Sequence, residues 1–104
     1  MQFVVVAQHA PESCPASNTQ IRELMREGAQ QIAELAARLG VDIITFRVLG
    51  PDHELIAVVE ATDIEAVRDF LLQSRLMQWN TVTVRATWSM EDALARAESV
   101  PALS

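Results

Sequence analysis

The residues best suited to chemistry in this sequence are two histidines, His9 and His53, and the single cysteine, Cys14. Imidazole nitrogen and thiolate sulfur are donors that suit zinc, copper or iron, and the nearby carboxylate of Glu12 adds a fourth donor. No two of these residues have a short metal-binding spacing such as CxxC or HxxxH. The sequence therefore predicts a metal site only if the fold brings His9 and His53 together.

Cys14 allows two other interpretations. It lies just ahead of an expected helix, whose positive end, together with His9, would favour a reactive thiolate. With no second cysteine, redox chemistry would be limited to mixed or intersubunit disulfides. The structural interpretation instead makes Cys14 a small buried hydrophobe and the histidines hydrogen-bonded side chains. The long connection from His9 to Thr19 favours a functional role, because long ordered loops often carry function.

Apolar patterning predicts the elements that must position these groups. Runs of β-branched residues indicate strands, apolar residues at helical spacing indicate helices, and Gly50-Pro51-Asp52 indicates the turn of a hairpin. In chain order we expect a strand over 3–8, a helix capped near Ser17 and ending at Gly40, strands over 41–49 and 54–61, a helix opening at 62–65, a strand over 81–88, and a short helix over 89–98.

This β-α-β-β-α-β order with a C-terminal short helix is typical of an α+β, ferredoxin-like fold. Such a fold has an antiparallel sheet in the order 4-1-3-2 with both long helices on one face. We expect one domain over 1–98 and a tail over 99–104. The first and third strands are apolar on both faces, so the open face requires a cover. A homodimer in which two sheets close into a dimeric α/β barrel would supply it.

This topology predicts that the unusual residues meet at one rim of the sheet. The first strand ends at His9, the third begins beside His53, and the second helix leads to Trp79 and Asn80. We expect a metal or a small ligand here. The candidate metal ligands are His9, Cys14, His53 and Glu12, and the candidate ligand-binding residues are Trp79, Asn80 and Arg85. Arg85 would face a barrel cavity and hold an anion, or form an intersubunit ion pair with Glu60.

Composition narrows the partners. The 104 residues carry fourteen acidic side chains against eight arginines, for a net charge of −6, which argues against nucleic acid and anionic membranes. The N-terminal apolar run is far shorter than the roughly 20 residues that span a bilayer. Because the one cysteine cannot form an internal disulfide, we expect a protein of the reducing cytoplasm.

Short stretches in the second half of the chain resemble a known group. Val58-Val59-Glu60-Ala61-Thr62-Asp63, Gln78-Trp79-Asn80 and Met90-Glu91-Asp92-Ala93-Leu94 resemble small uncharacterised bacterial proteins of the dimeric α/β-barrel superfamily. The resemblance implies a homodimer. It also implies kinship with cofactor-free monooxygenases, haem-degrading enzymes and muconolactone isomerase-like proteins, which use the cavity between sheet and helices.

Three functional hypotheses follow. The first is a small cytoplasmic homodimer that binds a transition metal or a small ligand at the His/Cys rim. The second is a non-catalytic interaction or assembly module, whose dimer surface and acidic helices serve a protein partner. The third is a cofactor-free monooxygenase-like enzyme with an apolar cavity.

Overall fold

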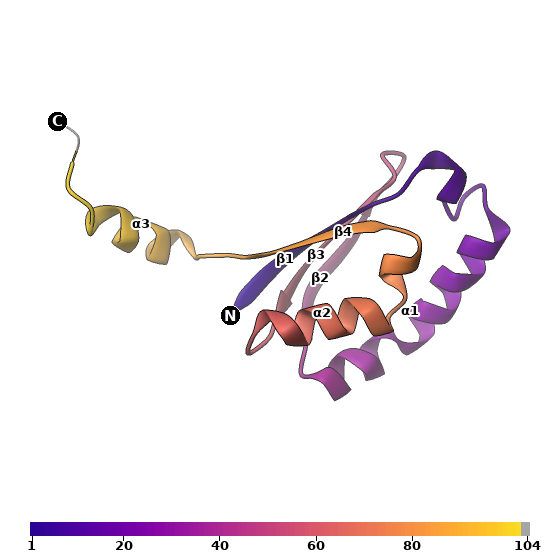
Figure 1. The fold of residues 1–104 in the computed structure, drawn as a ribbon, viewed down its shortest axis with the longest axis horizontal. Helices are drawn as coiled ribbons and strands as arrows, with labels where there is room; N and C mark the ends of the chain where they lie inside the picture. The colour runs from indigo at the N-terminus through magenta and orange to yellow at the C-terminus, as the bar shows by residue number, and fades with distance from the viewer. Residues whose placement is uncertain (103–104) are drawn as a thin grey trace.

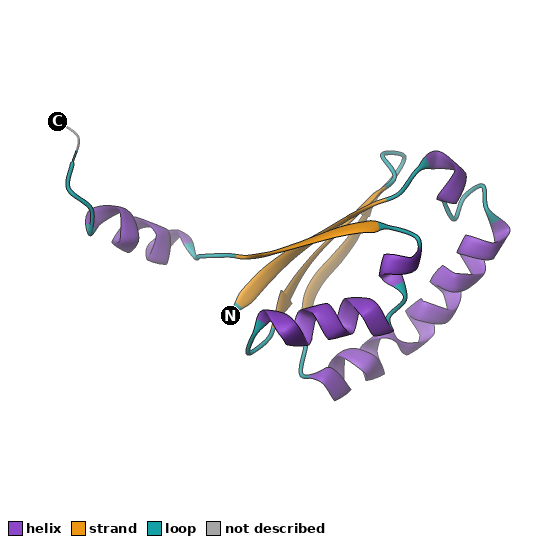
Figure 2. Ribbon diagram, viewed as in Figure 1, coloured by secondary structure: helices purple, strands orange, loops and turns teal. Residues whose placement is uncertain are grey.

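The computed structural model of the protein describes residues 1–102, and these form a mixed α+β fold (Figures 1 and 2). A four-stranded antiparallel sheet is combined with three α-helices and two short 3-10 turns, all within the described residues. The elements are β1 (Gln2–Gln8), η1 (Pro11–Ser13), α1 (Thr19–Leu39), β2 (Asp42–Leu49), β3 (Glu54–Glu60), α2 (Ile64–Gln73), η2 (Leu76–Gln78), β4 (Thr81–Ala86) and α3 (Met90–Glu98).

The strand order β2-β3-β1-β4 confirms the predicted order, and the arrangement is compatible with a ferredoxin-like fold. β1 lies in the centre and pairs antiparallel with both β3 and β4. In this register Gln8, the last residue of β1, is opposite Glu54 of β3 and Thr81 of β4. The end of β1 and the starts of β3 and β4 therefore share one rim of the sheet.

The core lies between the sheet and helices α1 and α2, which cover the same face (Figure 1). Alternation along β1 directs Phe3, Val5 and Ala7 to this face, where each is at most 3% exposed. Val67 of α2 is fully buried against them. Burial of one face of β1 and β3 against the apolar stripes of α1 and α2 fixes the register of these strands.

The helix ends follow from side-chain caps. α1 is capped by Asn18, whose Oδ1 accepts hydrogen bonds from the backbone N–H groups of Gln20 and Ile21, and not by the expected Ser17. Asn18 wins because its side chain reaches both amides, whereas the Ser17 hydroxyl donates to the Pro11 carbonyl. Gly40 ends α1 in the left-handed conformation, with φ 71°, that glycine adopts without steric cost.

The opposite face of the sheet carries half-buried apolar side chains, including Val4, Val6, Ile56 and Val58. Among residues 1–102 no helix covers it. α3 instead extends past the end of the sheet (Figure 1), with Leu94 58% exposed. The Cα radius of gyration of 16.4 Å accordingly exceeds the roughly 13 Å of a compact domain of this size. Ser99 to Ala102 follow α3, and the remainder of the expected tail, residues 103 and 104, lies outside the described residues.

Within residues 1–102, none of the helices combines the length and the apolar character needed to cross a bilayer.

Candidate metal site

The shared rim brings His9 and His53 together, as the topology predicts. The backbone N–H of His9 donates to the carbonyl of His53 at 3.0 Å, which continues the β1–β3 ladder by one step beyond the strands. The two rings meet edge to face, with centroids 5.5 Å apart and an interplanar angle of 75°. His53 lies in the β2–β3 turn with φ 58°, a left-handed conformation in which histidine is more frequent than most residues.

Cys14 reaches the same rim because its loop is tightly folded. Its backbone N–H donates to the Pro11 carbonyl at 3.2 Å, and its carbonyl accepts from the amides of Ser17 and Asn18 at 3.0 and 2.8 Å. One donor atom each of His9, Cys14 and His53 can be chosen so that all three lie within 4.8 Å of one another. This group could hold a metal ion.

Asn80 sets the orientation of the His9 ring. Its Nδ2 donates to the Leu76 carbonyl at 3.1 Å, so its Oδ1 is turned toward His9, where it lies 2.9 Å from Nδ1. An amide oxygen can only accept, so Nδ1 of His9 carries the proton and donates. In the neutral ring Nε2 of His9 then presents a lone pair, which is the form of histidine that binds a metal.

Two ring nitrogens of the cluster lack hydrogen bonds. Nε2 of His9 and Nδ1 of His53 are buried and have no hydrogen-bond partner among the described residues. A buried polar atom left without a partner costs about 1–3 kcal/mol, and such atoms are rare in folded proteins. An ion between these nitrogens and the Cys14 sulfur would satisfy both.

Trp79 packs against the His9 ring and supports the site. Its ring centroid lies 5.2 Å from that of His9, and the residue is only 8% exposed. Its neighbours in a small core cluster are Ala7 and Leu55. Of the three candidate ligand-binding residues, Trp79 thus packs against His9 and Asn80 hydrogen-bonds to it.

The structure does not bring the other predicted residues into the cluster. Glu12 is exposed in η1, and the contact it makes is through its carbonyl, which accepts from the side-chain amide of Asn18 at 3.1 Å. Arg85 is exposed on β4 opposite Val4, on the open face of the sheet. Glu60, its predicted partner in an intersubunit ion pair, accepts a hydrogen bond from the N-terminal amine of its own chain at 3.0 Å.

A cavity of about 260 Å³ opens at the cluster and is lined by His9, Cys14 and His53 together with largely apolar side chains. Two further potential ligands line it, Met25 of α1 and Glu54 of β3. Neither residue is predicted as a ligand from the sequence, because Met25 fits the apolar stripe of a helix and Glu54 the polar start of a strand. No local spacing in the sequence marks these two residues as potential ligands. Their place at the cavity follows only from the three-dimensional packing of α1 and β3 at the rim.

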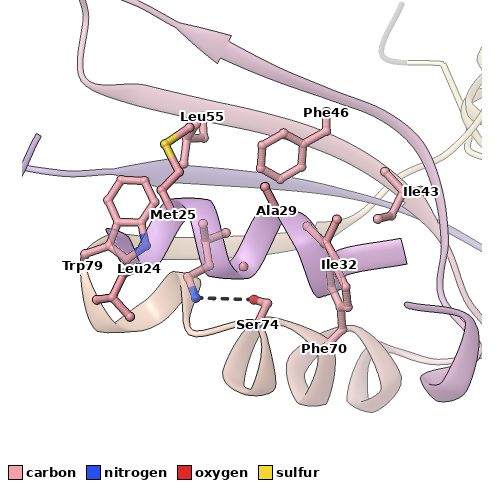
Figure 3. A pocket seen from close by; sticks show the side chains of 12 residues that line it. Leu24, Met25, Ala29, Ile32, Ile43, Phe46, Leu55, Phe70, Ser74 and Trp79 are labelled. Carbon is pink, nitrogen blue, oxygen red and sulfur yellow. Dashed lines mark hydrogen bonds between the residues drawn. The ribbon is translucent and has the colours of Figure 1, made fainter. Parts of the chain in front are cut away.

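A second cavity, of about 280 Å³, lies between the sheet and the helices (Figure 3). Its walls are apolar except for Ser74, whose hydroxyl donates to the Leu71 carbonyl and accepts from the backbone N–H of Leu76. Figure 3 shows Met25, Leu55 and Trp79 grouped at one end, and the same three side chains line the cavity at the cluster. They form the partition between the two cavities.

No family model matches this sequence, and none of the curated proteins compared with it matches either.

Proposed function

We propose that the protein binds a transition metal ion through Nε2 of His9, Nδ1 of His53 and Sγ of Cys14. The observation that carries the proposal is that each histidine of the 4.8 Å donor group with Cys14 has a buried ring nitrogen without a hydrogen-bond partner among the described residues. Two neutral imidazoles and one thiolate leave a single positive charge on a divalent ion. Three protein ligands also leave a coordination position for water or a small ligand, which is the pattern of catalytic rather than structural zinc sites.

The environment supports this assignment. Asn80 holds His9 in the metal-binding tautomer, as outer hydrogen bonds to ligating histidines commonly do. The chain carries a net charge of −6, which favours a cation over an anion as the guest. A reduced, ligating Cys14 fits a cytoplasmic protein, which we also propose here.

A second candidate function is the binding of a small apolar molecule in the cavity between sheet and helices. Its support is a volume of about 280 Å³ with almost wholly apolar walls. An engineered apolar cavity of roughly 150 Å³ already takes up benzene. This candidate corresponds to the monooxygenase-like alternative, and it is compatible with the metal site because the two cavities share Met25, Leu55 and Trp79.

We further propose that the protein is a homodimer of ferredoxin-like subunits. The half-buried apolar face of the sheet supports this, as do the exposed side chains of Trp88, just before α3, and of Leu94 in α3. Large exposed apolar patches mark interaction surfaces, and two-fold homodimers are the commonest soluble oligomers. Light scattering at micromolar concentration tests it, and a monomeric mass there would refute it.

Metal binding is tested by elemental analysis of untagged protein and by titration of the apo-protein with Zn²⁺ followed by calorimetry. We expect one ion per chain. The variants His9→Ala and Cys14→Ser should each lose stoichiometric binding. Glu12→Gln is the matched control, because Glu12 belongs to the same loop but its side chain is exposed; it should bind as the wild type does.

A metal stoichiometry far below one ion per chain under every loading condition, with no difference between the wild type and the variants, would refute the metal site. It would leave the interaction-module and apolar-ligand hypotheses. Loss of binding in Glu12→Gln would instead show that the loop carboxylate is a ligand, and the three-residue donor set proposed here would be wrong.

A further inference from the structure

The cavity at the cluster offers a fourth potential donor atom, which bears on the identity of the metal. The cavity at the cluster is lined by Met25 in addition to His9, Cys14 and His53. Met25 is half-buried on α1 and packs beside Leu55 and Trp79 in a small core cluster (Figure 3). Met25 therefore borders the cavity on the side of this core cluster.

Glu54 is the competing fourth donor, because it also lines the cavity. Its carboxylate, however, accepts a hydrogen bond from the side-chain amide of Gln8 at 3.3 Å, across the β1–β3 pair. The rest of the lining is made of apolar side chains and backbone, with Pro15, Val48 and Leu49 among them. Such surroundings disfavour hard, strongly hydrated metal ions and favour ions that accept soft donors such as thiolate and thioether.

The donor types now separate the candidate metals. Two imidazoles, one thiolate and a weak thioether form the set that copper accepts in mononuclear electron-transfer sites. Zinc takes imidazole and thiolate equally well, but it completes its shell with water or carboxylate rather than thioether. Copper(II) also binds a given site more tightly than zinc does, and thiolate and thioether both favour copper(I).

We propose that the ion held by this site is copper, and that the sulfur of Met25 is its fourth, weak ligand. The proposal rests on the metal site proposed above and adds both the identity of the ion and a residue outside the three-donor group. A copper ion held by His9, His53 and Cys14, with Met25 on the side of the small core cluster, would also lie beside the partition to the apolar cavity.

The first measurement is the visible spectrum of the apo-protein with one equivalent of copper(II) chloride. A cysteine thiolate bound to copper(II) gives an intense charge-transfer band, which should be present in the wild type and absent in Cys14→Ser. Met25→Leu should keep the stoichiometry but shift the band and the electron paramagnetic resonance parameters. Met77→Leu is the matched control, since Met77 is a methionine at the same rim, 49% exposed, that does not line the cluster cavity.

The second measurement avoids oxidation of Cys14 by copper(II). Under anaerobic conditions, competition with a colorimetric copper(I) chelator gives the copper(I) affinity, and calorimetry gives the zinc affinity. Met25→Leu should weaken copper(I) binding by at least about tenfold, the lower end for loss of a supporting group at a metal site. Its zinc affinity should stay within twofold of the wild type, about the resolution of the titration, and Met77→Leu should change neither.

The failures are distinguishable. If zinc binds through His9, His53 and Cys14 while Met25→Leu matches Met77→Leu in copper(I) affinity, the copper inference is wrong and the metal site stands. If zinc binds more tightly than copper(I), the choice of metal is likewise overturned. If neither ion binds stoichiometrically, the proposed function itself fails.

Discussion

The side-chain oxygen of Asn80 lies 2.9 Å from Nδ1 of His9, across 71 residues of sequence. The amide is held in place by its own bond to the carbonyl of Leu76, the first residue of η2. Asn80 is only 9% exposed, so both bonds are sheltered from water. The connection after α2 thus fixes the proton on a histidine at the end of β1, and through it the nitrogen that faces the cluster.

Replacement of Asn80 by leucine, which is similar in size, removes the acceptor and leaves Nδ1 of His9 free to lose its proton to Nε2. We expect zinc affinity to fall by about 10- to 100-fold, as for other outer partners of ligating histidines. Calorimetric titration measures it. Gln78→Leu, an exposed neighbour, serves as the control. Equal affinities in the two variants would show that Asn80 has no role in orienting the ring.

The two tryptophans provide a matched test of the packing beneath the site. Trp79 is 8% exposed and contacts the His9 ring, whereas Trp88 is 61% exposed, with the Arg96 guanidinium 4.3 Å from its ring centroid. We expect Trp79→Ala to lower the free energy of unfolding by about 3–5 kcal/mol. Trp88→Ala should lower it by about 0.5–1 kcal/mol in the monomer, the value of an exposed cation–π contact.

Urea unfolding followed by circular dichroism compares these variants, because the signal does not depend on tryptophan. A loss for Trp79→Ala no larger than that for Trp88→Ala would mean that the apolar cavity and the His9 ring do not depend on Trp79 for their support. Measurement at low protein concentration keeps a contribution of Trp88 to a dimer interface out of the comparison.

His53 combines a role in the turn with a role as a ligand, and two substitutions separate these roles. Asparagine also tolerates a left-handed backbone, so His53→Asn should change the free energy of unfolding by less than about 0.5 kcal/mol. His53→Val places a β-branched residue at φ 58° and should cost of order 1–3 kcal/mol.

Both His53 variants should lose stoichiometric zinc binding. Urea unfolding of the apo-proteins gives the stability difference, and calorimetry gives the binding. Retention of full zinc affinity in His53→Asn would remove His53 from the ligand set, whatever its effect on stability.

Much of the fold could be predicted from the sequence because it depends on local patterns. Alternating apolar residues place Phe3 and Val5 on the buried face of β1. The short turn between β2 and β3 enforces the pairing of those two strands. The meeting of His9 and His53 followed from the strand order alone. That inference needed no side-chain detail, because backbone hydrogen bonding carries both residues to the same rim.

The remaining details depend on three-dimensional packing. Glu12 is close to Cys14 in sequence, yet the loop closes through backbone bonds and leaves its side chain exposed. Met25 lies eleven positions beyond Cys14, and only the docking of α1 against β3 places it at the cavity. The hydrogen bond between His9 and Asn80 likewise depends on how the chain turns after α2, through η2, where Trp79 and Asn80 both donate to the Leu76 carbonyl.

The open face of the sheet gives the last prediction. Val6 lies at its centre, paired with Ile56 and Thr83 in the register of the sheet, and is half-buried in the single chain. A second copy packed on this face would bury Val6 completely, so Val6→Asp would place a charge in the interface at a cost of several kcal/mol. We expect this variant to be monomeric by light scattering where the wild type is dimeric.

Leu72→Asp is the control for Val6→Asp, since Leu72 is an apolar residue of α2 that is 64% exposed on the other side of the protein. This variant should remain dimeric, because Leu72 lies on α2, outside the open face of the sheet. Circular dichroism of both variants checks that they fold. A folded Val6→Asp variant that stays dimeric would place the interface elsewhere. The surface to test would then be the exposed side chains of Trp88, which precedes α3, and Leu94 of α3, because α3 extends past the end of the sheet (Figure 1).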